Sequence, residues 1–152
     1  MILLIVKGCL FAALLITAAV WDIRKRIIPD TIVLAILFVG GIGLSSLEGL
    51  FSALLDAIIT AVPYLLASIM VRKKEGLSVG GGDVKLMAAS GFVLGIWGGI
   101  LQSVLALTLA VLVGMITAFV KHKKINEIQI PLAPYLGVGG IFAYCTALAV
   151  KF

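Results

Sequence analysis

Charged residues are scarce in this 152-residue sequence: they make up 12% of it, against ~25% in an average soluble domain. Hydrophobic residues make up 62%, and the mean hydropathy is +1.27. This composition excludes an ordinary cytosolic globule, a disordered chain and a coiled coil. Two cysteines are too few for a disulfide-framed secreted domain. The composition therefore predicts an integral membrane protein that forms one domain over residues 1–152.

The two cysteines, Cys9 and Cys145, lie inside apolar stretches far apart in the sequence. Their spacing matches neither a C-x-x-C motif nor a set of zinc ligands. We therefore expect both to be small buried apolar residues.

A transmembrane helix needs about 20 predominantly apolar residues. Six stretches fit this requirement and predict an all-α membrane protein: Ile2–Val20, Ile28–Leu44, Leu50–Val71, Val84–Trp97, Gly98–Val120 and Ile130–Val150. The fourth and fifth of these spans depend on a break between them, because the apolar run from 84 to 120 is too long for one span. Gly95, Gly98 and Gly99 predict that break, since glycine favours turns.

The basic residues give the orientation of the six predicted spans. Ten of the twelve fall in three clusters next to the loops that follow the first, third and fifth spans: Arg24, Lys25 and Arg26; Arg72, Lys73, Lys74 and Lys85; Lys121, Lys123 and Lys124. By the positive-inside rule these loops face the cytoplasm, both termini face outside, and the protein is a multi-pass protein of the cell membrane. We expect the clusters to meet anionic lipid headgroups. The net charge of +5 does not indicate nucleic-acid binding, because it forms no separate basic face.

Two aspartates, Asp22 and Asp83, are predicted at the same cytoplasmic face of the membrane. Two carboxylates that approach closely cannot both ionise easily, so one holds a proton while the other stays charged. Such a pair can activate water and protonate a leaving group, as in aspartic proteases. Each also has a simpler interpretation: Asp22 as an interfacial charge beside Arg24, and Asp83 as the N-cap of an apolar helix.

The sequence around these aspartates contains two motifs. Asp22 begins a D-x5-I-P pattern that ends at Ile28 and Pro29, and Gly80–Asp83 reads G-x-G-D. A third segment, 131–136, reads Pro-Leu-Ala-Pro-Tyr-Leu ahead of the last span. Together these motifs resemble the type IV prepilin peptidase family of GxGD membrane aspartic proteases.

The resemblance implies a site and a substrate. It makes Asp22 and Asp83 the catalytic pair, without a metal or cofactor, and the substrate a prepilin-like precursor whose short basic leader is removed. It implies that further residues bind substrate or shape the site: Gly80, Gly82, Lys85, Pro29, Pro131 and Pro134. The loop after Asp22 is too short for the metal-binding insertion of the long family members, so the chain is similar to the short, peptidase-only form. Asp30 and Ala133 depart from the family pattern, which has Asn and Gly there in many members.

Two other functions remain open from the residues alone. A presenilin-like intramembrane protease also uses G-x-G-D, but its Tyr-Asp and P-A-L motifs have no match here. A small transporter or assembly protein would use carboxylates as a proton relay through the membrane, and Asp56 is the one acidic residue within a predicted span. Lys85 could hold an aspartate ionised, meet a substrate carboxylate, or simply extend toward the membrane surface. The oligomeric state is not indicated by any feature of the sequence.

Overall fold

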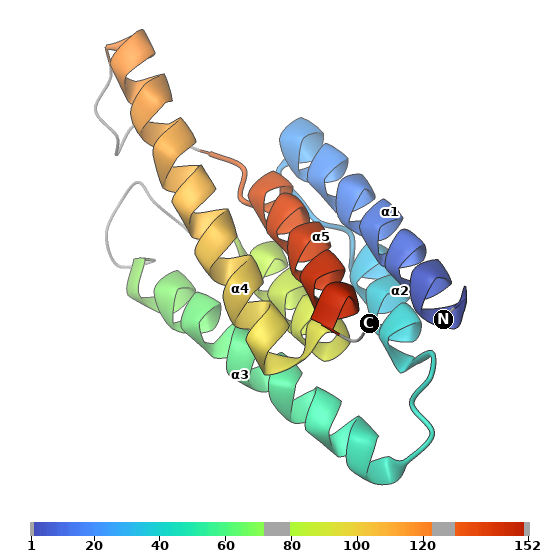
Figure 1. The fold of residues 1–152 in the computed structure, drawn as a ribbon. Coiled ribbons are helices and arrows are strands. Elements are labelled where there is room, and N and C mark those ends of the chain that lie inside the picture. Colours follow the sequence, from blue (N-terminus) through green and yellow to red (C-terminus); the bar gives the residue numbers. More distant parts are fainter. Residues whose placement is uncertain (1, 72–79, 123–129, 151–152) are drawn as a thin grey trace.

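The computed structural model describes residues 2–71, 80–122 and 130–150, and its regular structure in these ranges is entirely helical. Figure 1 shows the five elements: α1 Ile2–Lys25, α2 Asp30–Gly41, α3 Leu47–Val71, α4 Gly81–Lys121 and α5 Ala133–Val150. The all-α prediction is confirmed. The residues of the second and third basic clusters at 72–74 and at 123 and 124 lie outside the described ranges.

Besides its buried apolar core, the bundle exposes many large apolar side chains on its outside and buries several polar ones. Phe38, Trp97 and Phe119 are each about four-fifths exposed, whereas five polar residues are buried: Asp22, Thr60, Asp83, Ser90 and Gln102. This distribution suits a lipid environment. Four helices, α1, α3, α4 and α5, are long and apolar enough to cross a membrane.

The burial predicted for the two cysteines is wrong. Cys9 and Cys145 are both exposed on the surface of the bundle. In a membrane protein, an apolar environment in the sequence does not distinguish a helix face that meets lipid from one that meets another helix.

Helix α4 contains the two spans predicted as Val84–Trp97 and Gly98–Val120, and a break at Gly95 divides it. In a continuous helix, Met87 and Ser103 would lie about 24 Å apart at 1.5 Å per residue. In the structure the Ser103 hydroxyl donates to the Met87 sulfur at 3.7 Å. The two residues lie eight positions before and after Gly95, so the halves of α4 fold back on each other as a hairpin, whose turn is yellow in Figure 1.

The backbone at the turn requires glycine. Gly95 has φ 73° and ψ 176°, a region that side-chain-bearing residues hardly adopt. We expect Gly95→Ala to lower the free energy of unfolding by about 1–3 kcal/mol, the usual cost of such strain. An SDS-unfolding titration in detergent micelles measures this. Gly41→Ala is the control, because no described atom lies within 4 Å of its added methyl group; equal stability of the two variants would contradict the prediction.

Helix α2 is shorter than the predicted span Ile28–Leu44. It begins after Pro29, whose φ of −62° and ψ of 135° are extended, and it ends at Gly41. Gly43 then turns the chain with φ 89°. At 1.5 Å per residue, twelve residues extend about 18 Å, less than the ~30 Å hydrocarbon core of a bilayer. The six-span count and the orientation of the loops therefore stay predictions.

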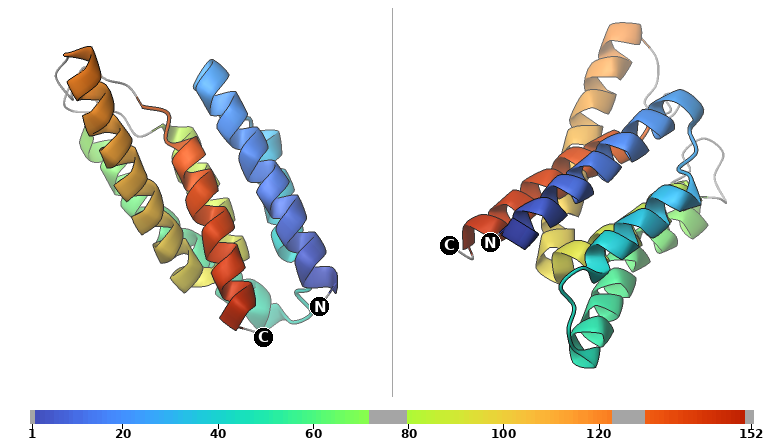
Figure 2. Two further views of the ribbon diagram at one scale, coloured as in Figure 1. Left: turned by 45° about the horizontal axis from the view of Figure 1, so that its top comes forward. Right: turned by 90° about the vertical axis from the view of Figure 1, so that its right-hand side faces the viewer.

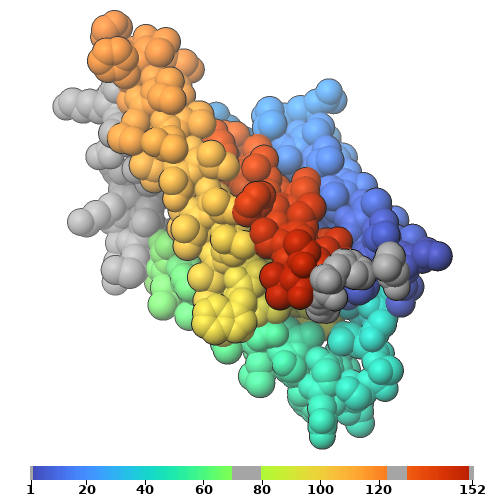
Figure 3. All heavy atoms as spheres, in the orientation of Figure 1, coloured from blue at the N-terminus to red at the C-terminus, as the bar shows by residue number. Residues whose placement is uncertain are grey.

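The first and last helices lie side by side. Helix α1 packs against α5, and α4 packs against α2, α3 and α5. Both views of Figure 2 place the start of α1 and the end of α5 at the same end of the bundle, and Figure 3 shows α5 between α1 and the second half of α4 on this face. The end of α1 and the starts of α2, α4 and α5 consequently meet at the opposite end.

Candidate active site

Asp22 and Asp83 come together at the end of the bundle where these four helix ends meet. Asp22 lies in the last turn of α1, and Asp83 lies in the first turn of α4, 61 residues later. Each side chain is only 8% exposed. The two carboxyl groups are close enough to interact electrostatically. The sequence therefore predicted correctly that they share one end of the fold.

The start of α5 holds Asp22. The Ala133 backbone N–H donates to Asp22 Oδ2 at 3.0 Å. The first N–H groups of a helix have no acceptor within the helix and attract negative charge. Pro134 follows and has no N–H, and the Tyr135 N–H donates to the Leu132 carbonyl oxygen at 3.1 Å. The first turn of α5 therefore directs one free donor, that of Ala133, at the carboxylate of Asp22.

This contact was not predictable from side chains. Pro131 and Pro134 were expected to shape the site, and they do not line its pocket. They flank the turn that presents the Ala133 amide. A backbone N–H leaves no signal in the residue type, so only the resemblance of the segment 131–136 to the family pattern pointed to this part of the chain.

Asp83 does not occupy the N-cap position. The N-cap of α4 is Gly80, and Asp83 is the third residue of the helix. Its Oδ2 accepts the Gly80 N–H at 3.2 Å, as a capping carboxylate does. Its Oδ1 is buried and, among the described residues, has no hydrogen-bond partner. Oδ2 therefore caps the start of α4, and Oδ1 is left for different chemistry.

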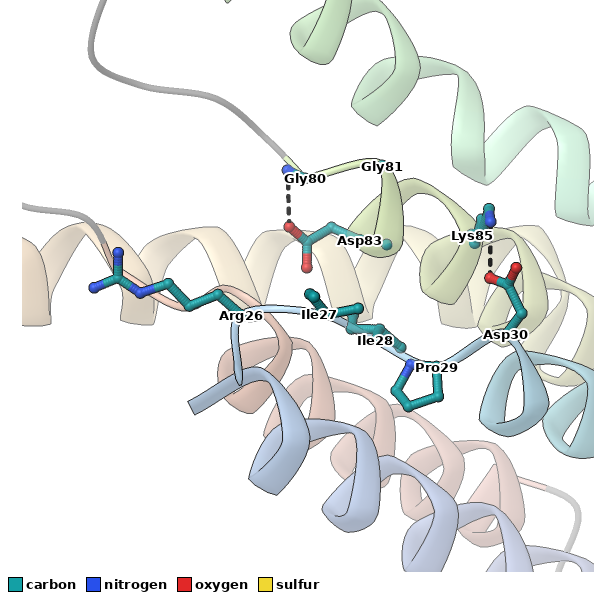
Figure 4. Close-up of a pocket in the computed structure, with 10 residues that line it drawn as sticks. Arg26, Ile27, Ile28, Pro29, Asp30, Gly80, Gly81, Asp83 and Lys85 are labelled. Carbon is teal, nitrogen blue, oxygen red and sulfur yellow. Dashed lines mark hydrogen bonds and ion pairs between the residues drawn. The ribbon is translucent and has the colours of Figure 1, made fainter. Parts of the chain in front are cut away.

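A cavity of about 510 Å³ opens beside Asp83. One wall is the α1–α2 connection from Arg26 to Asp30, and the other is the segment from Gly80 to Lys85 (Figure 4). Figure 4 shows the Asp83 carboxyl group directed toward Gly80 and the α1–α2 connection passing beside it. Pro29, Gly80, Gly82 and Lys85 all line this cavity. Their role in binding substrate or shaping the site stays a prediction.

The two walls contact each other closely at Gly82. A methyl group added at Gly82 would lie 3.2 Å from Cβ of the buried Ile28. At the neighbouring Gly81 no described atom lies within 4 Å of such a methyl group. Glycine at position 82 therefore lets the α1–α2 connection approach Asp83, whereas the middle position of G-x-G-D tolerates other residues.

Lys85 pairs with Asp30 and not with either buried aspartate. Its Nζ lies 2.7 Å from Asp30 Oδ1, and both side chains are more than half exposed. The pair joins the start of α2 to α4 across the cavity (Figure 4). Exposed ion pairs contribute only about 0–1 kcal/mol to stability, so this pair shapes the cavity wall rather than holding the fold together.

Asp56 lies away from these groups. Its carboxylate is near Gly95, where a methyl group on the glycine would lie 3.5 Å from Asp56 Oδ2. Twelve helical residues, about 18 Å at 1.5 Å each, separate Gly95 from Asp83. In residues 2–71, 80–122 and 130–150, no group of three His, Cys, Asp or Glu side chains could hold a metal ion.

Comparison with known proteins finds sequence matches to leader peptidases. The model of the type IV leader peptidase family matches residues 9–119, which include both aspartates. The prepilin leader peptidase/N-methyltransferase of Bacillus subtilis is 34% identical over 139 residues, which cover 88% of this chain and 53% of that protein. The protein of the same name from Pseudomonas aeruginosa is 36% identical over 139 residues, covering 85% of this chain and 45% of that protein.

The relative from Stutzerimonas stutzeri, with the same name, is 35% identical over 136 residues, covering 83% of this chain and 44% of its own. The chain thus spans about half the length of the curated relatives it matches. No solved structure matches it.

Proposed function

Because this chain belongs to the type IV leader peptidase family, we propose that it is a membrane aspartyl endopeptidase that removes the leader of type IV prepilin-like precursors. The observation that carries the proposal is the meeting of Asp22 and Asp83. Both are buried, they interact electrostatically, and a cavity opens beside one of them. Buried carboxyl groups that face each other share one proton, which is the arrangement that an aspartic protease requires.

The proposed reaction uses the two carboxyl groups as base and acid. The ionised carboxylate takes a proton from water as the water oxygen bonds to the scissile carbonyl carbon, and the protonated carboxyl gives its proton to the carbonyl oxygen. The tetrahedral intermediate then collapses: the C–N bond breaks, the leaving nitrogen takes the proton held by the first carboxyl, and the hydroxyl proton returns to the second. Water is consumed, and both aspartates regain their starting states.

The cavity fits an extended segment of peptide at the membrane surface. Its walls combine apolar side chains, from Ile27, Ile28 and Pro29, with the exposed backbone of Gly80 and Gly81. Glycine lets a substrate backbone approach closely. If the apolar segment of a precursor lies in the bilayer, the peptide bond next to that segment lies at the membrane surface, at the depth of the cavity. The names of the relatives, prepilin leader peptidases, support a prepilin-like substrate.

We further propose that this end of the bundle faces the cytoplasm. The residues of the first basic cluster, Arg24, Lys25 and Arg26, come just after Asp22, with only Ile23 between. The positive-inside rule places such a cluster in the cytoplasm, against anionic headgroups. A tag placed after Arg26 tests this by its protection from protease in right-side-out vesicles.

The proposal predicts unequal effects of two neighbouring glycine substitutions. Gly82→Ala forces Ile28 to move by a few tenths of an ångström and displaces the α1–α2 connection beside Asp83. We expect kcat/KM for precursor cleavage to fall about tenfold, because small misplacements of catalytic groups are costly. Gly81→Ala adds its methyl group in open space and should reduce kcat/KM much less. Equal losses in the two variants would contradict the proposed close contact.

A cleavage assay with purified components tests the proposed function. The purified protein in lipid nanodiscs is incubated with a panel of prepilin precursors, and the N-terminus of each product is sequenced. We expect one cut that separates the leader from the apolar segment. Intact precursors across the panel, with folded enzyme present, would refute the proposal.

A further inference from the structure

One side of helix α2 is apolar and exposed. The other side packs against α1 and α4 and buries residues such as Ile32 and Ile36. On the exposed side, Leu34 is 54% exposed and Phe38 is 79% exposed. The right view of Figure 2 shows α2, in cyan, at the edge of the bundle. This side of α2 is therefore open to whatever lies beside the bundle in the bilayer.

A groove of about 550 Å³ runs along this exposed side and is lined by five apolar residues: Leu34, Leu37, Phe38, Gly41 and Ile42. Residues spaced at three and four positions lie on one face of a helix. At Gly41 no described atom lies within 4 Å of an added methyl group, so the groove is open there. Small residues at such positions let a second helix approach closely within a bilayer.

The end of α2 is fixed by a residue of α1. Lys7 Nζ donates to the Gly40 carbonyl oxygen at 2.8 Å and to the Ile42 carbonyl oxygen at 3.1 Å. The last carbonyl groups of a helix have no donor within the helix, and leaving them unpaired in a bilayer is costly. Lys7 therefore stabilises the end of α2, and the groove beside that end is a preformed feature of the bundle.

The groove leads to the cavity beside Asp83. Asp30, in the first turn of α2, lines that cavity, and Leu34, one turn later, lines the groove. Side chains four residues apart on a helix are neighbours, with about 5–6 Å between their Cβ atoms. A chain that leaves the cavity past Asp30 therefore meets Leu34 and then Phe38 on its way into the bilayer.

The cavity and the groove fit two parts of one molecule. The cavity offers charged side chains and exposed glycine backbone, whereas the groove offers only hydrocarbon surface. A substrate with a polar segment joined to an apolar helix matches both. About twelve residues of such a helix extend ~18 Å, the length of α2 from its start at the cavity to its end at Gly41. A lipid chain would match the groove alone.

We propose that the groove on α2 binds the apolar helix that adjoins the scissile bond of the substrate. This inference deepens the function proposed above and rests on it. The substrate helix lies alongside α2, and the peptide next to it lies in the cavity beside Asp83. Because the groove is at a fixed distance from the cavity, docking on α2 selects which peptide bond reaches the aspartates.

The kinetic test compares two phenylalanine variants of the full chain in nanodiscs. Phe38→Ala should raise KM for cleavage of a prepilin precursor about three- to tenfold with kcat unchanged, since it removes packing contacts made equally in the ground state and the transition state. Phe119→Ala is the matched control. Phe119 is 82% exposed in the last turn of α4, far from α2 in Figure 1, and its loss should leave KM as in the parent. A parental KM in Phe38→Ala, a fall in kcat alone, or equal rises in both variants would overturn the proposal.

A second measurement does not depend on cleavage. A photoreactive phenylalanine analogue replaces Phe38 or Phe119 in the Asp83→Asn variant, which is reconstituted in nanodiscs with each precursor of the panel. We expect position 38 to cross-link to the apolar segment of a precursor and position 119 not to do so. Cross-links from position 38 to lipid or to a second copy of this chain, without the precursor, would overturn the proposal, as would equal cross-linking from both positions.

The two measurements separate this proposal from the peptidase function. A precursor that the parent cleaves but that never cross-links from position 38 would overturn docking on α2 and leave the peptidase function standing. A precursor that cross-links from position 38 while the parent cleaves none of the panel would refute the peptidase function and leave docking on α2 standing.

Discussion

Asp22→Asn and Asp83→Asn are each expected to lower kcat for precursor cleavage by about 10²–10⁴-fold, the range associated with loss of general acid–base catalysis. An asparagine side chain cannot take a proton from water and cannot supply one to the carbonyl oxygen. The loss should therefore appear in kcat, with KM for the precursor near the parental value, because asparagine has nearly the shape of aspartate and leaves the outline of the cavity that Asp83 lines unchanged.

The substitution is chosen because it preserves shape and local hydrogen bonds. The asparagine carbonyl oxygen can still accept the Ala133 N–H at position 22 and the Gly80 N–H at position 83. The free energy of unfolding should then stay near that of the parent, which separates chemistry from folding. Asp56→Asn is the control, since Asp56 lies beside the turn of α4 and not at the site.

Cleavage is measured by the gel shift of a precursor at equal enzyme concentrations. Either aspartate variant with a kcat within a factor of ten of the parent would contradict the two-aspartate mechanism. A large loss in Asp56→Asn, at an unchanged free energy of unfolding, would contradict the assignment of the chemistry to Asp22 and Asp83 alone.

Gly139→Ala is expected to lower the free energy of unfolding by about 2–6 kcal/mol, the sum of an overpacking cost and a hydrogen-bond cost. Its methyl group would lie 2.6 Å from the Gln102 carbonyl oxygen, a backbone atom that cannot rotate away. Helices α4 and α5 must therefore separate, which costs about 1–3 kcal/mol as overpacking. The separation also strains a buried hydrogen bond, in which Gln102 Nε2 donates to the Leu136 carbonyl oxygen at 2.9 Å. Breaking this bond leaves a buried polar group unsatisfied, which costs a further ~1–3 kcal/mol.

The matched control for this prediction lies on the same helix. Gly137→Ala would place its methyl group 3.6 Å from the Leu15 carbonyl oxygen, which is ordinary contact. In an SDS-unfolding titration we expect Gly137→Ala to be much closer to the parent than Gly139→Ala. Similar stabilities for the two variants would show that α4 and α5 pack less closely than described.

Sequence reasoning succeeded where a feature is local. Length and hydropathy were enough to predict the helices, and Gly95 supplied the expected break because a single residue determines that turn. Asp22 and Asp83 were singled out because each stands in a short motif, and their catalytic role stays a prediction. The ends of α2 were missed, because Ile42 and Leu44 continue the apolar pattern beyond Gly41, where the helix stops.

The remaining features depend on tertiary contacts. Lys85 pairs with Asp30 from a position 55 residues away, and its charge alone did not distinguish that partner from a buried aspartate. The Ala133 amide reaches Asp22 from another helix, α5, whose sequence does not indicate which side chain that amide binds. The side of the membrane on which the site lies stays a prediction from the basic clusters.

The central claim is that Asp22 and Asp83 act as one catalytic unit, and a double-mutant cycle tests it most directly. We would measure single-turnover cleavage of one precursor by Asp22→Asn, Asp83→Asn and the double variant, all in nanodiscs. Groups that act as a unit give strongly non-additive effects. We predict that the double variant is no slower than the slower single variant. Rate losses that multiply, so that the double variant is slower by the product of the two, would show that the aspartates act independently and would contradict this account.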